Sequence, residues 1–246
     1  MRMMLAFALA ISGCGAVDEA ANTDESSIQG GHVDSADPAV GLVWFQGGGF
    51  CSGTLIAPDV VLTAGHCVAD PVEGFYTGAG KRVAAVGEDP ASGMTRHAVA
   101  AQLAHPSYSP LGGCPNQTFD VGLIRLEKPL TTVKPLPRAS AAPAYSSACR
   151  IVGYGVHNTD ANDETFEQKR GANVWVKAVG QSWIDLLWKT GIADHGDSGG
   201  PLLCNEQIAA VTSCGVDGVY PDHREAYYAR TDDIGKWIDS TVKSWK

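Results

Sequence analysis

The sequence predicts an all-β fold, because of its turn-forming residues, its low charge and the spacing of its apolar residues. Its 246 residues include 29 glycines and 13 prolines, which favour tight turns, and only 18% of them are charged. Apolar residues occur in short alternating runs, as in half-buried strands, and not in long runs with a helical period. A chain of this length can bury one sizeable core or two smaller fused ones.

The charge balance excludes two classes of ligand. The formal net charge is -9 at pH 7. A chain with this charge has no basic field for nucleic acid or for an anionic lipid surface, so we expect neither as a ligand.

Residues 1–13 are predicted to be a signal peptide. Arg2 precedes the apolar run 3–11, which is too short to span a bilayer permanently. The run ends in the sequence I-S-G-C at 11–14, which resembles the bacterial lipobox, where the cysteine is acylated and becomes the new N-terminus. This resemblance implies lipidation of Cys14. Ordinary cleavage nearby, followed by full secretion, is the alternative.

Residues 14–27 are predicted to be a lipidated tether or a propeptide. The segment after Cys14 is small, polar and acidic, and it contains too few apolar residues to form a core. Acylation would anchor the protein to a bacterial membrane. Seven cysteines in an exported chain leave one unpaired, and lipidation of Cys14 would account for it.

A glycine-rich turn holds the first candidate site. The segment 196–201, G-D-S-G-G-P, places Ser198 on a tight turn from which its hydroxyl can project. The backbone amides of Gly196 and Ser198 can converge on one point and form an oxyanion hole. A purely structural turn is the alternative interpretation of this motif.

Two further segments supply a histidine and an aspartate. His66 ends the segment L-T-A-G-H, and Asp120 begins the segment D-V-G-L-I-R-L. With the serine turn, they resemble the trypsin and chymotrypsin family, whose patterns are T-A-A-H-C, D-[IV]-A-L-[IL]-x-L and G-D-S-G-G-P. The departures are glycines at Gly65 and Gly122. The order histidine, aspartate, serine is also that of the family.

The resemblance covers residues 28–246 and implies two six-stranded antiparallel β-barrels packed face to face, with a C-terminal helix. The first barrel is expected at about 28–127, a linker at 128–147 and the second barrel at about 148–230. The helix is predicted at 231–246, behind a Thr-Asp cap, because apolar residues recur there at helical spacing. These residues are Ile234, Trp237, Ile238, Val242 and Trp245.

The resemblance also implies a serine endopeptidase. Ser198 would be the nucleophile, His66 the general base, and Asp120 the residue that orients the histidine, with the amides of Gly196 and Ser198 as the oxyanion hole. A catalytically inactive, protease-like binding module of the cell envelope is the alternative. A structural envelope lipoprotein would explain only the leader.

Six cysteines remain after Cys14. The resemblance implies two disulfides, Cys51–Cys67 and Cys149–Cys204. By elimination Cys114 would then pair with Cys214, and two free buried thiols are the alternative for that pair.

The segment I-Q-G-G at 28–31 looks like the mature start of the family, usually I-V-G-G. Cleavage before Ile28 would create an ammonium group that pairs with Asp197, so we expect a zymogen. Ser27 precedes the cut, which argues against self-activation of the tryptic kind. The same cut would release the enzyme from a lipid anchor. An ordinary first strand after a linker is the alternative.

Counting from Ser198 with the family's spacing predicts a pocket without an acidic floor. This disfavours cleavage after Arg or Lys and favours a small or medium apolar residue. The expected substrate-binding residues are Ile192, Ala193, His195, Ser213, Cys214, Gly215 and Ala226. His195 either contacts substrate or is a solvated loop residue. The family's pocket cysteine is replaced by Asp194, and Asp194, Asp217 or Glu225 could reach inward.

We expect no cofactor and no metal. Asp70, Glu73, Glu88 and Asp89 lie loosely where some relatives of the family hold calcium, but their spacing is not that of a defined oxygen cage. The expected partner is a protein or peptide substrate, and the expected state is a monomer.

Overall fold

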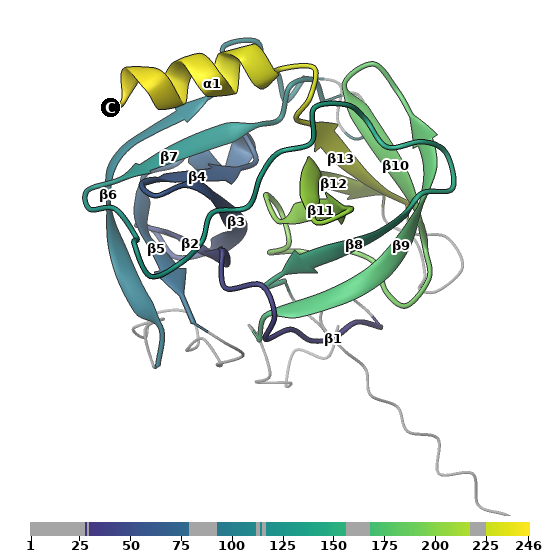
Figure 1. Ribbon diagram of the computed structural model, residues 1–246, viewed down its shortest axis with the longest axis horizontal. Helices are drawn as coiled ribbons and strands as arrows, with labels where there is room; N and C mark the ends of the chain where they lie inside the picture. The colour runs from purple at the N-terminus through teal and green to yellow at the C-terminus, as the bar shows by residue number, and fades with distance from the viewer. Residues whose placement is uncertain are drawn as a thin grey trace, which may run out of the picture.

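Two antiparallel β-barrels lie side by side in the computed structural model of this chain (Figure 1). The structure describes residues 28, 30–78, 93–111, 114, 117–155, 168–216 and 225–246. Within these ranges, no helix is both long enough and apolar enough to cross a membrane.

The first barrel closes in the strand order β2-β3-β4-β7-β6-β5. Its strands are β2 (Val40–Phe45), β3 (Phe50–Ala57), β4 (Val60–Thr63), β5 (Val72–Thr77), β6 (Thr95–Ala104) and β7 (Gly122–Leu126). Every residue of β4 is buried, since one face of this strand fills the barrel and the other is also covered. Alternating apolar side chains from these strands, among them Val43, Leu55, Val61, Phe75 and Ile124, form the interior.

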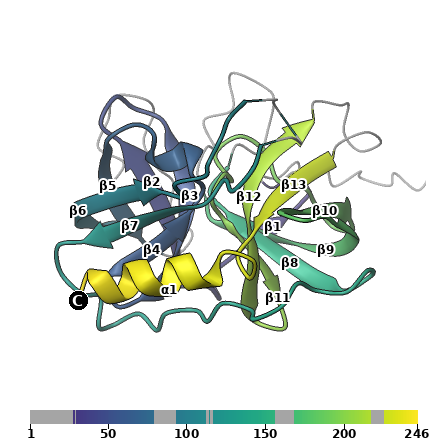
Figure 2. The same cartoon turned by 90° about the horizontal axis from the view of Figure 1, so that it is seen from above.

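The second barrel has the strand order β9-β10-β13-β12-β11-β8 and closes through the pairing of β8 with β9. Its strands are β8 (Ala148–Gly153), β9 (Arg170–Val179), β10 (Trp183–Trp188), β11 (Pro201–Cys204), β12 (Gln207–Val216) and β13 (Glu225–Arg230). The prediction of two six-stranded antiparallel barrels is therefore confirmed. The segment between β7 and β8 crosses from one barrel to the other (Figures 1 and 2).

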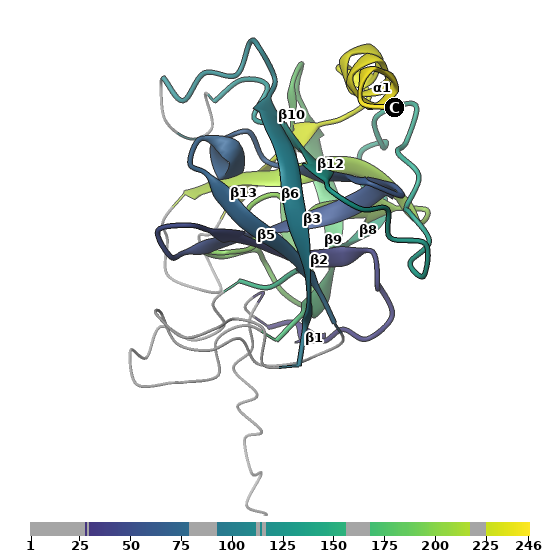
Figure 3. The ribbon, with the colours of Figure 1, turned by 90° about the vertical axis from the view of Figure 1, so that its left-hand side faces the viewer.

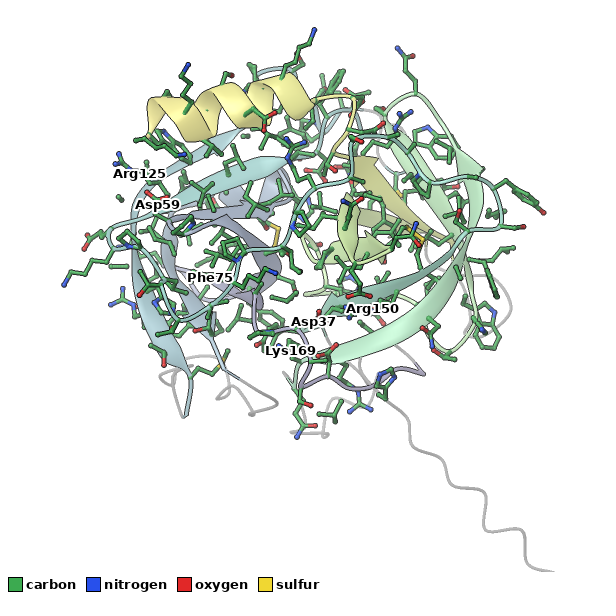
Figure 4. All side chains as sticks on the ribbon, in the orientation of Figure 1. Asp37, Asp59, Phe75, Arg125, Arg150 and Lys169 are labelled. Carbon is green, nitrogen blue, oxygen red and sulfur yellow. A yellow bond between two sulfur atoms is a disulfide. The ribbon has the colours of Figure 1, made fainter. Side chains whose placement is uncertain are left out.

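The short strand β1 (His32–Val33) pairs with β9 of the second barrel, although its residues were expected to belong to the first. Charged side chains around the buried Asp37 explain this position. The Asp37 carboxylate accepts a hydrogen bond of 2.8 Å from Arg150, and the buried Lys169 ammonium donates to the Asp37 carbonyl. Figure 4 shows these three side chains together. Separating them would leave costly unpaired charges, so they fasten the N-terminal segment to the second barrel.

The C-terminal helix α1 (Gly235–Ser244) begins later than predicted. The Thr231 hydroxyl donates to the carbonyls of Ile208 and Ala209, and Asp232 pairs with Arg230, so neither residue caps the helix. The helix lies along the outside of the molecule beside the first barrel, as the turned views show (Figures 2 and 3).

Candidate active site

His66 and Asp120 are brought together by two neighbouring strands of the first barrel. His66 begins the 3₁₀ turn η1 (His66–Val68) just after β4, and Asp120 lies just before β7. Since β4 and β7 are paired antiparallel, with Thr63 opposite Gly122, the end of β4 meets the start of β7. One Asp120 carboxylate oxygen lies 2.8 Å from His66 Nδ1, and the other accepts the His66 backbone N–H at 2.8 Å.

The second barrel also contributes to this site. The hydroxyl of Ser213, on β12, donates to Asp120 Oδ2 over 2.6 Å. The Asp120 side chain is 1% exposed, so its charge depends on these donors rather than on water. Ser213 was expected to lie on the strand that binds substrate backbone, which stays a prediction. The structure shows in addition that its side chain contacts the aspartate.

The ring of Tyr108 and the Asp120 carboxylate both lie close to Gly65. A Cβ atom at Gly65 would lie 3.0 Å from the Tyr108 ring and 3.1 Å from Asp120 Oδ1. Burial, with a smaller contribution from the Asp120 charge, raises the pKa of Tyr108 to about 12, so this phenol keeps its proton near neutral pH. The glycine leaves room for the ring next to the carboxylate.

Gly122 departs from the family pattern for a related reason. A Cβ atom there would lie 2.6 Å from the Ala64 carbonyl oxygen and 2.7 Å from the Val68 side chain. Backbone oxygen cannot move aside cheaply, so β7 approaches the segment before His66 more closely than alanine would permit.

The Ser198 turn packs against the same end of β4. Gly196 and Gly199 have φ angles of +91° and +78°, which favour glycine. A Cβ atom at Gly199 would overlap Thr63 Oγ1 and lie 2.7 Å from the Ala64 amide nitrogen. The Ser198 carbonyl accepts the backbone N–H of Ser52 at 2.8 Å. The turn therefore abuts the residues that lead to His66.

Ser52 is a contact residue that the sequence analysis missed. Its hydroxyl donates to the Gly196 carbonyl at 3.0 Å and accepts the Tyr154 backbone N–H at 2.9 Å. Together with its own N–H, these bonds join β3 of the first barrel to the serine turn. Its place directly after Cys51 was the only signal in the sequence.

Within the described residues, the backbone amides of Gly196 and Ser198 donate to no other group of the protein. The Ser198 hydroxyl and the His66 ring, both among the described residues, are not hydrogen-bonded to each other. Catalytic hydrogen bonds are often long in unliganded enzymes and tighten when substrate binds.

Asp197 points into the second barrel. Its carboxylate is 1% exposed and accepts the N–H groups of Gly155 at 2.8 Å and Asp194 at 2.9 Å. Burial is the main reason why the pKa of Asp197 rises from 3.8 to about 7, because both of its donors are neutral amides. Ile28 is 1% exposed and belongs to the core of the same barrel.

The predicted substrate-binding residues differ in exposure. Ile192 and Ala226 are buried in the second barrel, and Ala193 packs partly against its core, whereas Gly215 is exposed. Asp194 hydrogen-bonds to the N–H and ring of the exposed His195, so this acid is turned toward its neighbour. Asp217 and the side chain of Glu225 lie outside the described residues.

All three predicted disulfides are present, Cys51–Cys67, Cys149–Cys204 and Cys114–Cys214. Cys14 lies outside the described residues, as do Glu88 and Asp89. His66 Nδ1 or Nε2 lies within 4.8 Å of the Cys51 and Cys67 sulfurs. These sulfurs are bonded to each other and are not thiolate ligands.

Comparison with known proteins identifies the family. A family model described as Trypsin matches residues 28–238. The chain belongs to the trypsin family. The venom plasminogen activator Haly-PA of Gloydius brevicauda is 30% identical over 226 residues, covering 82% of this chain and 81% of that protein. The thrombin-like enzyme bhalternin of Bothrops alternatus is 29% identical over 218 residues, covering 82% and 81%.

A solved structure agrees with this family at the level of the fold. Mouse neuropsin, described as a serine protease, superposes with a TM-score of 0.68 at 24% identity, covering 86% of this chain and 98% of that one. With the family and its protease relatives, this supports a trypsin-like serine endopeptidase, as predicted.

The close contact at Gly122 predicts that this position requires glycine. We expect Gly122→Ala to lower the free energy of unfolding by about 1 to 3 kcal/mol, because the added methyl group meets backbone on one side. Turnover should fall as well, since Asp120 is two residues away. Gly47→Ala is the matched control, because a Cβ atom there meets nothing within 4 Å. Denaturant unfolding of both variants measures the difference, and equal stabilities would contradict the interpretation.

Proposed function

We propose that this protease hydrolyses peptide bonds through an acyl-enzyme, with Ser198 as nucleophile, His66 as general base and Asp120 as the residue that orients the base. The observation that supports this most is the buried Asp120 carboxylate bonded to His66 Nδ1. With Nδ1 engaged as a donor, Nε2 is left as the basic nitrogen of the neutral ring. The Ser198 turn packs against the strand end that precedes this histidine.

The chemistry follows from the weak acidity of a hydroxyl group. Ser198 Oγ attacks the substrate carbonyl while His66 Nε2 takes its proton, and Asp120 stabilises the imidazolium. The new oxyanion is stabilised by the amides of Gly196 and Ser198, which have no other partner among the described residues. His66 then protonates the leaving amine. Water repeats the sequence and releases the acid.

The triad is tested by Ser198→Ala. We expect kcat to fall by on the order of a millionfold and covalent labelling by a fluorophosphonate to disappear, because only binding and oxyanion stabilisation remain. Ser240→Ala is the control, since this exposed serine lies on α1 and its hydroxyl donates, among the described residues, to the Trp237 carbonyl alone. A Ser198→Ala protein that still labels and turns over normally would refute the assignment.

We also propose that the chain is a zymogen activated by cleavage before Ile28. The buried Asp197 carboxyl supports this, because its donors are neutral and burial raises its pKa to about 7. An ammonium group at Ile28, already buried in the same barrel, would supply the missing charge. The bonds from Arg150 and Lys169 to Asp37 would keep the N-terminal segment on that barrel after cleavage.

Cleavage should change how stability depends on pH. In the uncut chain the pKa of Asp197 is raised from its ordinary value of 3.8 to about 7, which stabilises the folded state. This contribution is full when the pH is below 3.8, and it is lost as the pH rises through about 7. The cut form should lose less stability between pH 5 and 7.5, since its ammonium pairs with the carboxylate. Melting temperatures of both forms, and of uncut Asp197→Asn as control, measure this. Identical profiles would contradict the pairing.

Mass spectrometry of the native N-terminus tests processing and lipidation together. We propose an exported protein, which agrees with its three disulfides and with its venom protease relatives. Lipidation of Cys14 in a bacterial envelope stays a prediction. Active enzyme should begin at Ile28, and a fully active form that begins at Cys14 would overturn the zymogen proposal.

For specificity we propose a small or medium apolar residue before the scissile bond. Ile192 and Ala226 are buried and apolar where the pocket is expected, and the Asp194 carboxylate bonds to the neighbouring His195. Among the residues that the structure describes here, this leaves no acid to bind the side chain of Arg or Lys. A panel of peptides that differ only at this position should show at least about tenfold higher kcat/KM for Ala, Val or Leu than for Arg. A preference for Arg would contradict the pocket assignment.

A further inference from the structure

The disulfide Cys114–Cys214 is unlike the other two because it joins the barrels. Cys114 lies in the loop between β6 and β7 of the first barrel, and Cys214 lies on β12 of the second, 100 residues away. By contrast, Cys51–Cys67 lies within the first barrel and Cys149–Cys204 within the second. A bond between barrels can control how parts of the active site from each barrel meet.

One end of this disulfide adjoins the Asp120 contact, and the other lies in the loop that leads to Asp120. Cys214 directly follows Ser213, whose hydroxyl donates to Asp120 over 2.6 Å. Cys114 lies in the same loop as Asp120, between Ser109 and Thr118, which form an antiparallel bridge. That bridge ties the two sides of the loop together two residues before Asp120. A restraint on Cys114 therefore acts within the bridged loop that leads to Asp120.

Ser213 itself is weakly held by its own strand. The pairing of β12 with β13 shifts register here, since Thr212 lies opposite Tyr228 and Cys214 opposite Tyr227, which leaves Ser213 as the extra residue of a β-bulge. A bulge re-aims a side chain and interrupts the ladder. The pairing of β12 with β11 ends at Val211, and the backbone of Thr212 still bonds to Gly199 and Gly200. Among the described residues, no strand pairs with Ser213 itself on that side. Its position depends on its neighbours, and one of them is the disulfide.

We propose that the Cys114–Cys214 disulfide is a positioning element of the active site, which holds the bulged Ser213 against Asp120 and thereby fixes the His66 imidazole. This inference rests on the catalytic roles proposed above. It goes beyond stabilisation of the fold, because it assigns the disulfide an effect on the catalytic step that passes through one hydrogen bond.

A double-mutant cycle tests this coupling. The four proteins are the wild type, Ser213→Ala, Cys114→Ala with Cys214→Ala, and the triple variant. With Ser213 present, loss of the disulfide should lower kcat about tenfold with little change in KM. In the Ser213→Ala background the same loss should lower kcat less than about twofold, because the contact that the disulfide positions is already gone. Equal factors in both backgrounds, or no effect in either, would overturn the proposal.

A matched control separates positioning from general stability. Cys149→Ala with Cys204→Ala removes a disulfide within the second barrel and should lower the melting temperature while leaving kcat of the folded enzyme within about twofold. If this pair lowers kcat as much as the inter-barrel pair, the special role of Cys114–Cys214 is refuted.

Selective reduction covers the case in which the cysteine variants do not fold. Cys114 and Cys214 are half-buried, whereas the other four disulfide cysteines are buried, so a dithiol reductant should open the inter-barrel bond of the folded protein first. The cycle is then repeated by capping both thiols with iodoacetamide, in the wild type and in the Ser213→Ala variant. The capping groups add the same bulk to both proteins, so their steric effect cancels in the comparison. Full capping that costs equal activity in both proteins would count against the proposal.

The proton on His66 Nδ1 gives a readout that does not need turnover. Its NMR resonance should shift when the disulfide is opened in the wild type and stay in place in the Ser213→Ala variant. An unchanged resonance in the wild type would refute the positioning role. Failure of the wild type to react with a fluorophosphonate would refute the proposed catalysis alone, so the two failures are distinguishable.

Discussion

The buried carboxylate of Asp120 is the group on which the arrangement of the active site depends. A carboxylate that is 1% exposed cannot be solvated by water, so its hydrogen-bond donors must come from the protein. Two of them belong to His66 in the first barrel and the third to Ser213 in the second. The relative position of the barrels is therefore tied to the solvation of one charge, and the same bonds that satisfy this charge also orient the imidazole.

The second barrel contains a buried carboxyl group, Asp197, whose hydrogen-bond donors differ from those of Asp120. Asp197 accepts two neutral amides, and burial raises its pKa to about 7, so the proton stays bound until near neutral pH. Asp120 is held by a histidine, which suits the proposed role of stabilising charge during turnover. Among the described residues, Asp197 instead has only neutral amide donors. The contrast fits the proposed roles, in which Asp120 serves catalysis and Asp197 pairs with the new N-terminus after cleavage.

The sequence predicted the features that depend on local pattern. The serine turn, the His66 strand end and the Asp120 strand start were visible as motifs, and alternating apolar runs indicated the strands. Contacts set by distant pairing were not visible. The strand β1 joins the second barrel because charged side chains from β8 and from the segment before β9 meet the buried Asp37. The helix starts at Gly235 because the predicted cap residues bond elsewhere.

The bulge at Ser213 shows why such contacts escape sequence reasoning. Nothing in S-C-G marks an interrupted ladder, since the register shift arises only when β12 meets β13. A bulge costs strand pairing, and that cost is offset here because the freed serine reaches a buried carboxylate in the other barrel. The adjacent cysteine then adds a covalent link at the point where the ladder is weakest. The bulge and the disulfide thus act together. The bulge frees the side chain of Ser213, and the disulfide holds the adjacent residue near the charge in the other barrel.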